Sequence, residues 1–220
     1  HSFLFLTVPD GYRAAGSFFH PVPEASGNVD FELETAPSRA NPNFTLAQIT
    51  DIHVRAAPYY RPQGAWLGPK TGPTLTRDLR KLEREARPDL IVCTGDLTDW
   101  GTMAELKLFR DSIAPIRTPI YPIYGGHDGT EELTAQGGSR EGYDHVDGKS
   151  CVKNYQKVLG PVQYSFDRGG RHFVVFSKED SYFTLEDVKR KDRWLLEDLA
   201  RQPDGRESVV LMHTPPSVEF

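Results

Sequence analysis

Residues 90–99 read LIVCTGDLTD, and this stretch constrains the fold more than any other part of the chain. Its apolar run stops at Gly95 and is followed by two carboxylates, Asp96 and Asp99. A short apolar run bounded by turn residues is typical of a buried parallel strand. A carboxylate at the carboxyl end of such a strand lies where open α/β sheets bind ligands. We therefore expect a buried strand that ends in a functional site.

The same pattern, an apolar run that ends in Asp or His, occurs three more times. FTLAQITDIH at 44–53 ends in Asp51 and His53, IYPIYGGHD at 120–128 ends in His127 and Asp128, and SVVLMH at 208–213 ends in His213. Apolar residues at helical spacing precede residues 90 and 120, which predicts a crossover helix before each of these strands. Two consecutive βαβ units predict a parallel sheet with right-handed crossovers.

The second half of the chain has a different order of predicted elements. Residues 129–150 are rich in Gly, Asp and Ser and predict a long loop. The segments VQYSFD and HFVVFS flank residues 168–170, which predicts an antiparallel hairpin. Apolar spacing then predicts a helix over residues 185–200 before the last strand.

Residues 1–42 form a separate region in composition. SFLFLTVP and VDFELET alternate as strands do, and a segment rich in Gly, Pro and aromatic residues separates them. Two strands are too few for a stable sheet, so this region either docks on the rest or is the remnant of a larger β domain. We expect a β-rich appendage and linker over 1–42 and the main domain over 43–220.

Charge and hydropathy narrow the partners. The net charge of -5, from 26 basic and 31 acidic residues, argues against a nucleic acid polymer as partner and leaves small anionic substrates open. No apolar run approaches the ~18 residues of a membrane span, so none is expected.

The residues at the strand ends form a set of metal ligands. Asp51 and His53 stand two apart, so in an extended segment both side chains point to the same side. Asp96 has two oxygens that could each contact a different ion, and the imidazole of His213 suits Zn, Fe, Mn or Co better than calcium. Two ions ~3.5 to 4 Å apart can hold a phosphoryl group for in-line displacement. A metal-free acid-base hydrolase is disfavoured because these residues form no pair of nucleophile and base.

These blocks resemble the ordered motifs of the calcineurin-like metallophosphoesterases. The family pattern is DxH, GDxxD, GNH followed by an acidic residue, an isolated His, and GHxH. This chain has DIH at 51–53, GDLTD at 95–99, GGHD at 125–128 and LMH ending at residue 213. The resemblance covers about residues 44–220 and extends in texture to a bacterial, often exported branch with an N-terminal β domain. It implies an α/β fold: a metallophosphoesterase-type β-sandwich flanked by helices, with a short N-terminal β appendage.

The resemblance also implies residue roles. Asp51 and His53 would bind a first metal, Asp96 would bridge both metals, and His213 would bind the second. His127 would protonate the leaving oxygen or stabilise the charge of the transition state, with Asp128 orienting its imidazole. The implied reaction is hydrolysis of phosphate monoesters or diesters by a metal-bridging hydroxide. The implied cofactors are two divalent transition metal ions, Mn, Fe or Zn.

Two departures from the family pattern bear on the second metal. Gly126 stands where the family has Asn, and glycine offers no side-chain oxygen. The chain also ends at Phe220, before any GHxH block, which we interpret as truncation or cleavage within the catalytic domain. The second metal site is therefore the weaker expectation, and a separate C-terminal fragment could supply the missing ligands.

Alternatives remain open at this stage. Cyclic nucleotides, nucleotides, phospholipid headgroups and phosphoproteins are all candidate substrates, and a catalytically impaired binding protein on the same scaffold is the second hypothesis. Location in the periplasm or outside the cell is expected from the resemblance. His172 begins a strand and is interpreted as structural, while His145 and the aromatic residues of 59–66 could reach or line a pocket.

Overall fold

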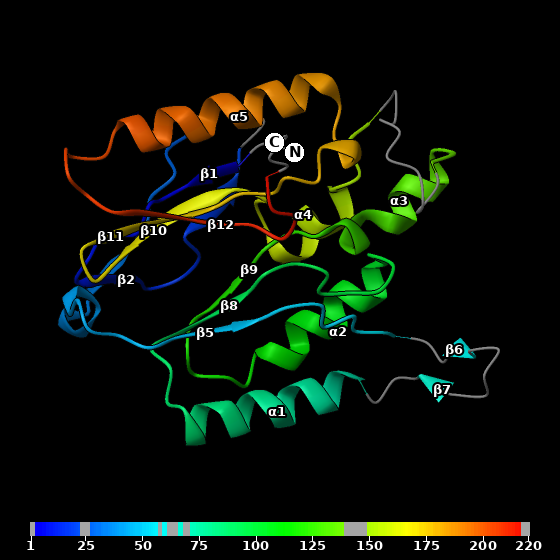
Figure 1. Cartoon of the computed structure of the whole chain (residues 1–220), viewed down its shortest axis with the longest axis horizontal. Coiled ribbons are helices and arrows are strands. Elements are labelled where there is room, and N and C mark those ends of the chain that lie inside the picture. Colours follow the sequence, from blue (N-terminus) through cyan, green and yellow to red (C-terminus); the bar gives the residue numbers. More distant parts are fainter. Residues whose placement is uncertain are drawn as a thin grey trace.

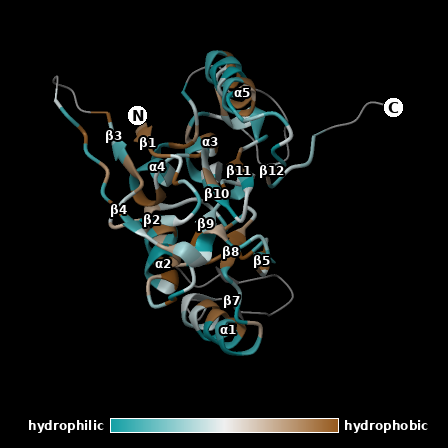
Figure 2. Cartoon of the chain, turned by 90° about the vertical axis from the view of Figure 1, so that its left-hand side faces the viewer, coloured by the Kyte–Doolittle hydropathy of each residue, from teal (hydrophilic) through white to brown (hydrophobic). Residues whose placement is uncertain are grey.

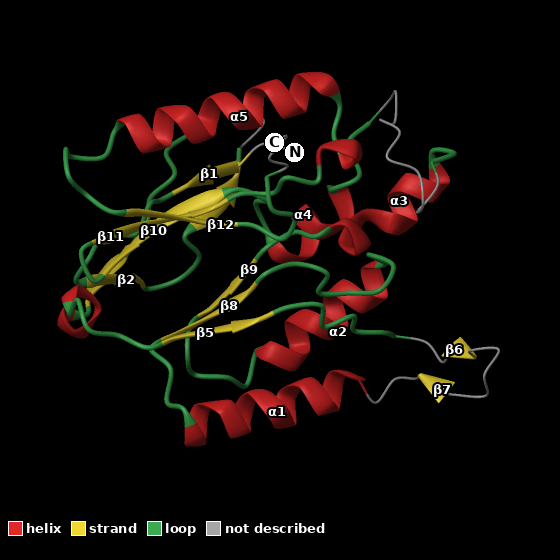
Figure 3. Cartoon of the chain, in the orientation of Figure 1, coloured by secondary structure: helices red, strands yellow, loops and turns green. Residues whose placement is uncertain are grey.

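Two three-stranded β-sheets face each other at the centre of this computed structural model, which describes residues 3–22, 27–56, 59–60, 66–67, 71–138 and 149–216. Helix α5 lies over one sheet, and α1 and α2 lie beneath the other (Figure 1). Figure 3 shows the two layers of strands between the helices. The predicted sandwich flanked by helices is therefore confirmed.

The first sheet consists of three parallel strands in the order β5-β8-β9, with β5 at Leu46–Ile49, β8 at Leu90–Cys93 and β9 at Ile120–Pro122. Ile49 pairs with Cys93, and Cys93 pairs with Pro122, so the carboxyl ends of the three strands are level. Helices α1 (Thr71–Glu85) and α2 (Met103–Ile113) are the two predicted crossovers. The loops that follow the carboxyl ends of the three strands therefore meet at one edge of the sheet.

The second sheet combines the predicted hairpin with the last strand. Strands β10 (Tyr164–Arg168) and β11 (Arg171–Val175) are antiparallel, and β12 (Ser208–Leu211) runs parallel to β11. Gly169 and Gly170 turn the hairpin with φ of 60° and 80°, a region that side chains other than glycine rarely adopt. Helix α5 spans Leu185–Ala200, as the spacing predicted.

Strand β8 is buried on both faces, as a parallel strand covered by another layer on each side must be. Leu90 and Val92 face the second sheet and pack with Phe166 and Phe173. Ile91 and Cys93 belong to the other cluster, which lies against the helices. Figure 2 shows hydrophobic colouring on the central strands and hydrophilic colouring over much of α1 and α5.

The N-terminal region docks on the sandwich, as one of the two expectations for it stated. Strand β1 (Phe3–Phe5) pairs with β3 (Phe19–Pro21), and β2 (Tyr12–Ala14) pairs with β4 (Leu33–Thr35). Val8 forms a bridge with Phe166 of β10. The ring of Phe5 meets the ring of Trp194 on α5 edge to face, with centroids 5.7 Å apart. The division into domains at residues 42 and 43 stays a prediction.

Several short elements were not predicted. The expected loop over 129–150 is wrong in its first part, because α3 forms at Thr130–Ala135 and continues from the 3-10 helix Gly126–Gly129. Helix α4 (Lys153–Leu159), the 3-10 helices Pro37–Ala40 and Asp180–Tyr182, and the two-residue strands β6 (Tyr59–Tyr60) and β7 (Trp66–Leu67) also lack a sequence prediction. One or two helical turns hold too few residues to show a 3.6-residue period, so tertiary contacts determine them.

Two predictions fall outside the described part of the chain. His145 lies in residues 139–148, and the side chains of 59–60 and 66–67 are likewise not described, so neither expected pocket contribution is tested. Among the described residues, no helix has both the length and the apolar character needed to cross a membrane.

Candidate metal centre

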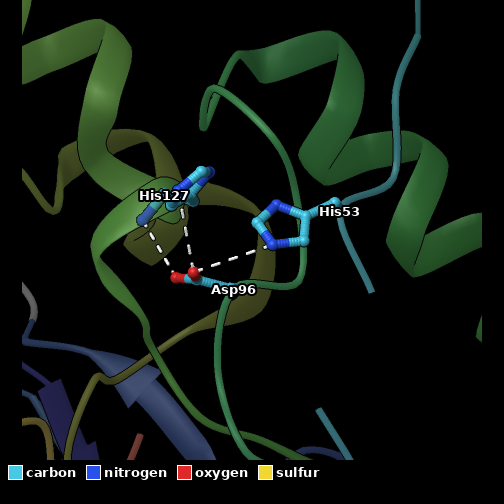
Figure 4. A group of neighbouring side chains, drawn as sticks. All are labelled: His53, Asp96 and His127. Atoms are coloured by element: carbon cyan, nitrogen blue, oxygen red, sulfur yellow. Dashed lines mark hydrogen bonds and ion pairs between the residues drawn. The ribbon is translucent and has the colours of Figure 1, made fainter. Parts of the chain in front are cut away.

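All the predicted strand-end residues meet at one edge of the sandwich. Asp51 and His53 follow β5, Asp96 follows β8, His127 lies in the 3-10 helix after β9, and His213 follows β12. Figure 4 shows His53 and His127 pointing toward the Asp96 carboxylate. The rings of His53 and His127 are edge to face with centroids 4.4 Å apart. Residues that lie up to 162 positions apart in the chain thus form one cluster.

The backbone at three of these residues adopts an unusual conformation. Asp51, His53 and Asp96 have φ of 52°, 47° and 50°, in the left-handed region. Residues other than glycine are uncommon in this region, because it strains their backbone. Such strained residues cluster at functional sites. The expectation that Asp51 and His53 converge because they lie in an extended segment is therefore wrong, since β5 ends at Ile49. They converge because two left-handed turns redirect the chain.

Hydrogen bonds between neighbouring loops hold this strained backbone in place. The Asp51 N–H donates to the Gly95 carbonyl (3.2 Å), and the His53 N–H donates to the Asp96 carbonyl (3.0 Å). Gly95 itself has φ of 92°, and a Cβ there would lie 2.5 Å from Cβ of His213. Only glycine fits this turn, so the packing of the His213 ring depends on it.

Asp96 lies at the centre of the cluster. Its Oδ1 is 3.3 Å from Nε2 of His213 and accepts a hydrogen bond from the His127 backbone N–H (3.0 Å). Its Oδ2 is 3.8 Å from Nε2 of His53 and 3.8 Å from Nε2 of His127. Asp51 Oδ1 is also 3.8 Å from Nε2 of His53. The two carboxylate oxygens of Asp96 therefore face two separate groups of side chains.

Each of these groups has the geometry of a metal-binding set. His53, Asp96 and His127 place ligand atoms within 4.8 Å of one another, and so do Asp51, Asp96 and His213. Asp96 belongs to both groups, as expected of a bridging ligand. The grouping also places His127 beside His53, closer to a metal-ligand position than the sequence analysis expected.

All three histidines turn the same ring nitrogen toward Asp96, because the other nitrogen meets an oxygen. Nδ1 of His213 lies 2.7 Å from the Thr94 carbonyl, and Nδ1 of His127 lies 3.1 Å from the Asp99 carbonyl. Nδ1 of His53 lies 3.6 Å from Oδ1 of Asp99. A carbonyl only accepts a hydrogen bond, so Nδ1 of His127 and of His213 carries a hydrogen, and Nε2 is the nitrogen of each ring that could bind a metal.

Asp99 and Arg55 are two functional candidates that the sequence analysis did not assign. Oδ1 of Asp99 faces Nδ1 of both His53 (3.6 Å) and His127 (3.8 Å), while Oδ2 forms an ion pair with Arg55. Asp99 was visible as the second carboxylate of GDLTD, but its partners could not be read from spacing. Arg55 gave no signal, because nothing local to DIHVR distinguishes it from an exposed arginine.

The predicted role of Asp128 is wrong. Its carboxylate is fully buried and accepts hydrogen bonds from the N–H groups of Leu97, Thr98 and Gly125 and from the Thr98 hydroxyl. It does not orient the His127 ring, whose Nδ1 meets Asp99. Asp128 instead joins the loop that carries Asp96 to the loop that carries His127. Burial raises the pKa of Asp128 to about 7.

The protonation of the cluster follows from its contacts. Burial alone would raise the pKa of Asp96, but hydrogen bonds from His213 and from the His127 N–H keep it below its ordinary value. The hydrogen bond to Asp96 raises the pKa of His213 to about 9, against the effect of burial. Asp96 is therefore ionised at neutral pH and attracts cations.

The donor set fits a divalent transition metal. Three imidazole nitrogens and two carboxylates converge, and imidazole ligands favour Zn, Cu, Fe and Ni over calcium or magnesium. The backbone strain and the Nδ1 contacts hold these donors in position, so much of the cost of assembling the site is met by the fold. A sandwich with such a cluster at its strand ends is the arrangement of a metallophosphoesterase.

Comparison with known proteins agrees with this class. The family model described as calcineurin-like phosphoesterase matches residues 44–219. The chain therefore belongs to the calcineurin-like phosphoesterase family. The resemblance stated from the four sequence blocks is confirmed.

Several relatives are named as phosphodiesterases. A probable glycerophosphodiester phosphodiesterase of Arcobacter nitrofigilis is 47% identical over 130 residues, which cover 59% of this chain and 43% of that protein. A probable cyclic nucleotide phosphodiesterase of Synechococcus is 34% identical over 174 residues, covering 78% of this chain and 58% of that protein. A 3',5'-cyclic-nucleotide phosphodiesterase of Nostoc is 28% identical over 182 residues, covering 79% and 58%. The chain thus spans about half the length of these relatives.

Among solved structures, a purple acid phosphatase from yellow lupin seeds matches 82% of this chain and 32% of its own. The TM-score is 0.45 and the sequence identity is 14%.

Proposed function

We propose that this chain is the catalytic part of a metal-dependent phosphodiesterase that hydrolyses small phosphate diesters. One observation carries the proposal: Nε2 atoms of His53, His127 and His213 all face the Asp96 carboxylate, each with its Nδ1 turned to an oxygen. This arrangement suits metal binding, because three imidazole nitrogens converge on one carboxylate while contacts at the opposite ring nitrogen hold the rings in orientation.

The residues of the cluster have different roles according to their positions. Asp51, His53, Asp96 and His213 would hold two divalent ions, with Asp96 contributing one oxygen to each. When bound, such ions lower the pKa of a water nucleophile and neutralise charge on the phosphate. Asp99, backed by Arg55, keeps the His53 and His127 rings in orientation.

His127 has a second possible task. Its Nε2 faces the centre of the cluster at 3.8 Å from Oδ2 of Asp96, and a quarter of its side chain is exposed. A ring that is both held in the cluster and accessible can pass a proton to a leaving alkoxide. We assign it the role of proton donor or stabiliser of transition-state charge, as the family resemblance implied.

The relatives are named as phosphodiesterases, which favours diesters over monoesters as substrates of this chain. Those relatives are named for glycerophosphodiesters and cyclic nucleotides, both of which are small phosphate diesters. Between these two classes the cluster itself does not discriminate, because metal ions held there would bind the phosphate group that both classes share.

Hydrolysis assays on the purified chain test the proposal. The chain would be stripped with a chelator, reloaded with Mn, Fe or Zn, and assayed with bis(p-nitrophenyl) phosphate, p-nitrophenyl phosphate, a glycerophosphodiester and cyclic AMP. We expect metal-dependent turnover of the diesters, loss of it in Asp96→Asn, and none of this loss in Asp78→Asn, whose carboxylate is exposed on α1.

The outcome separates the competing hypotheses. Faster turnover of the monoester would move the assignment to a phosphatase. Uptake of metal without hydrolysis of any substrate would favour the binding protein on the same scaffold. Failure to take up metal would contradict the proposal.

A further inference from the structure

Glu179 lies beside the candidate metal centre, where its charge interacts with that of His213. It follows β11, in the loop that leads to the 3-10 helix Asp180–Tyr182. Its Oε1 accepts a hydrogen bond from the hydroxyl of Thr214 (2.5 Å), the residue next to His213. Across the described ranges, no Lys or Arg forms an ion pair with it, although it is half-buried. Burial of a charged carboxylate costs free energy, and a bound cation would offset this cost.

The other oxygen of Glu179 faces Gly126. A Cβ on Gly126 would lie 3.4 Å from Oε2 of Glu179 and 3.3 Å from the hydroxyl of Tyr182. Gly126 is part of a regular 3-10 helix and its φ is outside the left-handed region, so its backbone does not require glycine. A side chain at position 126 would occupy the space in front of Glu179, and His127 is the next residue in the chain.

The three donors on this side are fewer than a transition metal prefers. Asp51, Asp96 and His213 form one group, and divalent transition ions usually take four to six ligands. Glu179 stands just outside this group, tied to the residue after His213. A change of side-chain rotamer would bring the carboxylate to this group, and the missing side chain at Gly126 leaves space beside its Oε2.

We propose that Glu179 is an additional oxygen ligand of the ion held by Asp51, Asp96 and His213, and that Gly126 makes room for it. This inference rests on the proposed function, because it needs that ion to bind. It assigns the chain a carboxylate ligand that comes from the second sheet, whereas Asp51 and Asp96 come from the first. The two layers of the sandwich would then be joined through the metal by Glu179 as well as by His213.

A purely positioning role makes a different prediction. If Glu179 acts through its bond to Thr214, then removing the Thr214 hydroxyl should have the same effect as removing the carboxylate. If Glu179 is a ligand, Thr214→Val should leave metal affinity nearly intact. The two roles are therefore distinguishable by comparing two variants.

Calorimetric titration of the chelator-treated chain with Mn²⁺ alone tests the inference without any assay of hydrolysis. We expect Glu179→Ala to weaken the binding of one ion at least about tenfold, since even the loss of a residue behind a ligand typically costs 10 to 100-fold. Glu186→Gln, an exposed acid on α5, is the matched control and should bind as the wild type does. The rise in melting temperature on adding Mn²⁺ gives an independent readout.

Rescue at Gly126 provides the sharpest test. The double variant Gly126→Asn with Glu179→Ala places an amide oxygen on the opposite side of the same space, and we expect it to regain most of the lost affinity. Gly126→Asn alone should gain little, because Glu179 already fills the role.

Each outcome has one reading. Wild-type affinity in Glu179→Ala, or equal losses in Thr214→Val and Glu179→Ala without rescue, would overturn the ligand role while leaving the proposed function in place. A wild-type chain that binds no Mn²⁺, Fe²⁺ or Zn²⁺ would overturn both.

Discussion

Asp99 contacts two histidines of the candidate metal centre without belonging to either metal-binding group itself. It meets Nδ1 of two histidines on one side and the Arg55 guanidinium on the other. Its backbone carbonyl also accepts from the His127 ring. The ligands can therefore be correct in identity and still fail in orientation if this residue changes.

We predict that Asp99→Asn weakens metal binding about 10 to 100-fold and lowers diester turnover in parallel, because the His53 and His127 rings lose the carboxylate charge that faces their Nδ1 atoms. Titration with Mn²⁺ and the diester assay measure both effects. Asp78→Asn removes an exposed carboxylate of the same kind and should change neither. Unchanged metal affinity in Asp99→Asn would show that the rings are held by packing alone.

Asp128 acts on stability in the same region. Its carboxylate accepts from three backbone N–H groups and one hydroxyl in a fully buried position. Asp128→Ala leaves those donors unpaired, so we expect a loss of about 2 to 4 kcal/mol in the free energy of unfolding. Thermal unfolding should show a drop of about 4 °C or more. Asp111→Asn, exposed on α2, is the control and should melt as the wild type does.

At the scale of elements, a buried charge cluster joins the hairpin to α5. Nδ1 of His172 on β11 lies 2.9 Å from Asp167 on β10, and Nε2 lies 2.8 Å from Asp198 on α5. Arg206 also contacts Asp167 at 3.0 Å, and the Ser165 hydroxyl donates to Asp198 (3.2 Å). The structural interpretation of His172 agrees with this position, because its ring is fully buried and both ring nitrogens contact carboxylates of the cluster.

This cluster predicts a specific pH dependence of stability. Burial opposes the charge on His172, but the two carboxylates outweigh it and raise its pKa from 6.5 to about 9. A raised pKa means that the stabilisation is complete below pH 6.5 and is lost as the pH rises through about 9. The size is about 3 kcal/mol at most.

Urea unfolding of wild type and His172→Gln at pH 6 and pH 9.5 isolates this effect. The difference in unfolding free energy between the two proteins should be large at pH 6 and shrink at pH 9.5. Other groups titrate equally in both proteins and cancel in the comparison. A difference independent of pH would mean that His172 is neutral in the folded chain.

At the scale of the whole molecule, the N-terminal strands complete the outer surface of the second sheet. Phe5 packs on Trp194, the Thr7 hydroxyl lies 2.8 Å from the Ser165 hydroxyl, and Asp10 accepts from the Gly170 N–H. These contacts tie residues near the start of the chain to β10, the hairpin turn and α5. The region should therefore unfold together with the sandwich.

Phe5→Ala tests this coupling. We expect a loss of about 1 to 2 kcal/mol in unfolding free energy for this half-buried ring, with a single transition retained. Leu4→Ala, on the exposed side of the same strand, should cost much less. A separate early transition in the wild type would show that the N-terminal strands unfold on their own.

Local pattern in the sequence determined most of the framework. Runs of apolar residues predicted the strands β5, β8, β9 and β12, and helical spacing predicted α1, α2 and α5, because burial imposes periods of 2 and 3.6 that need no knowledge of the partner. Asp51, His53, Asp96, His127 and His213 were identifiable for the same reason, since each stands where an apolar run ends.

The tertiary structure alone decided how those residues are oriented. Several features depend on loops that are distant in the sequence and meet only in the folded chain: the left-handed backbone at Asp51, His53 and Asp96, the Nδ1 contacts of the three histidines, and the bonds of Asp128. Asp99, Arg55 and Glu179 gain their importance in the same way, from neighbours distant in sequence. The period of apolar residues indicates whether a side chain is buried. The direction of a polar atom depends instead on which group of a neighbouring loop lies opposite it in the folded chain.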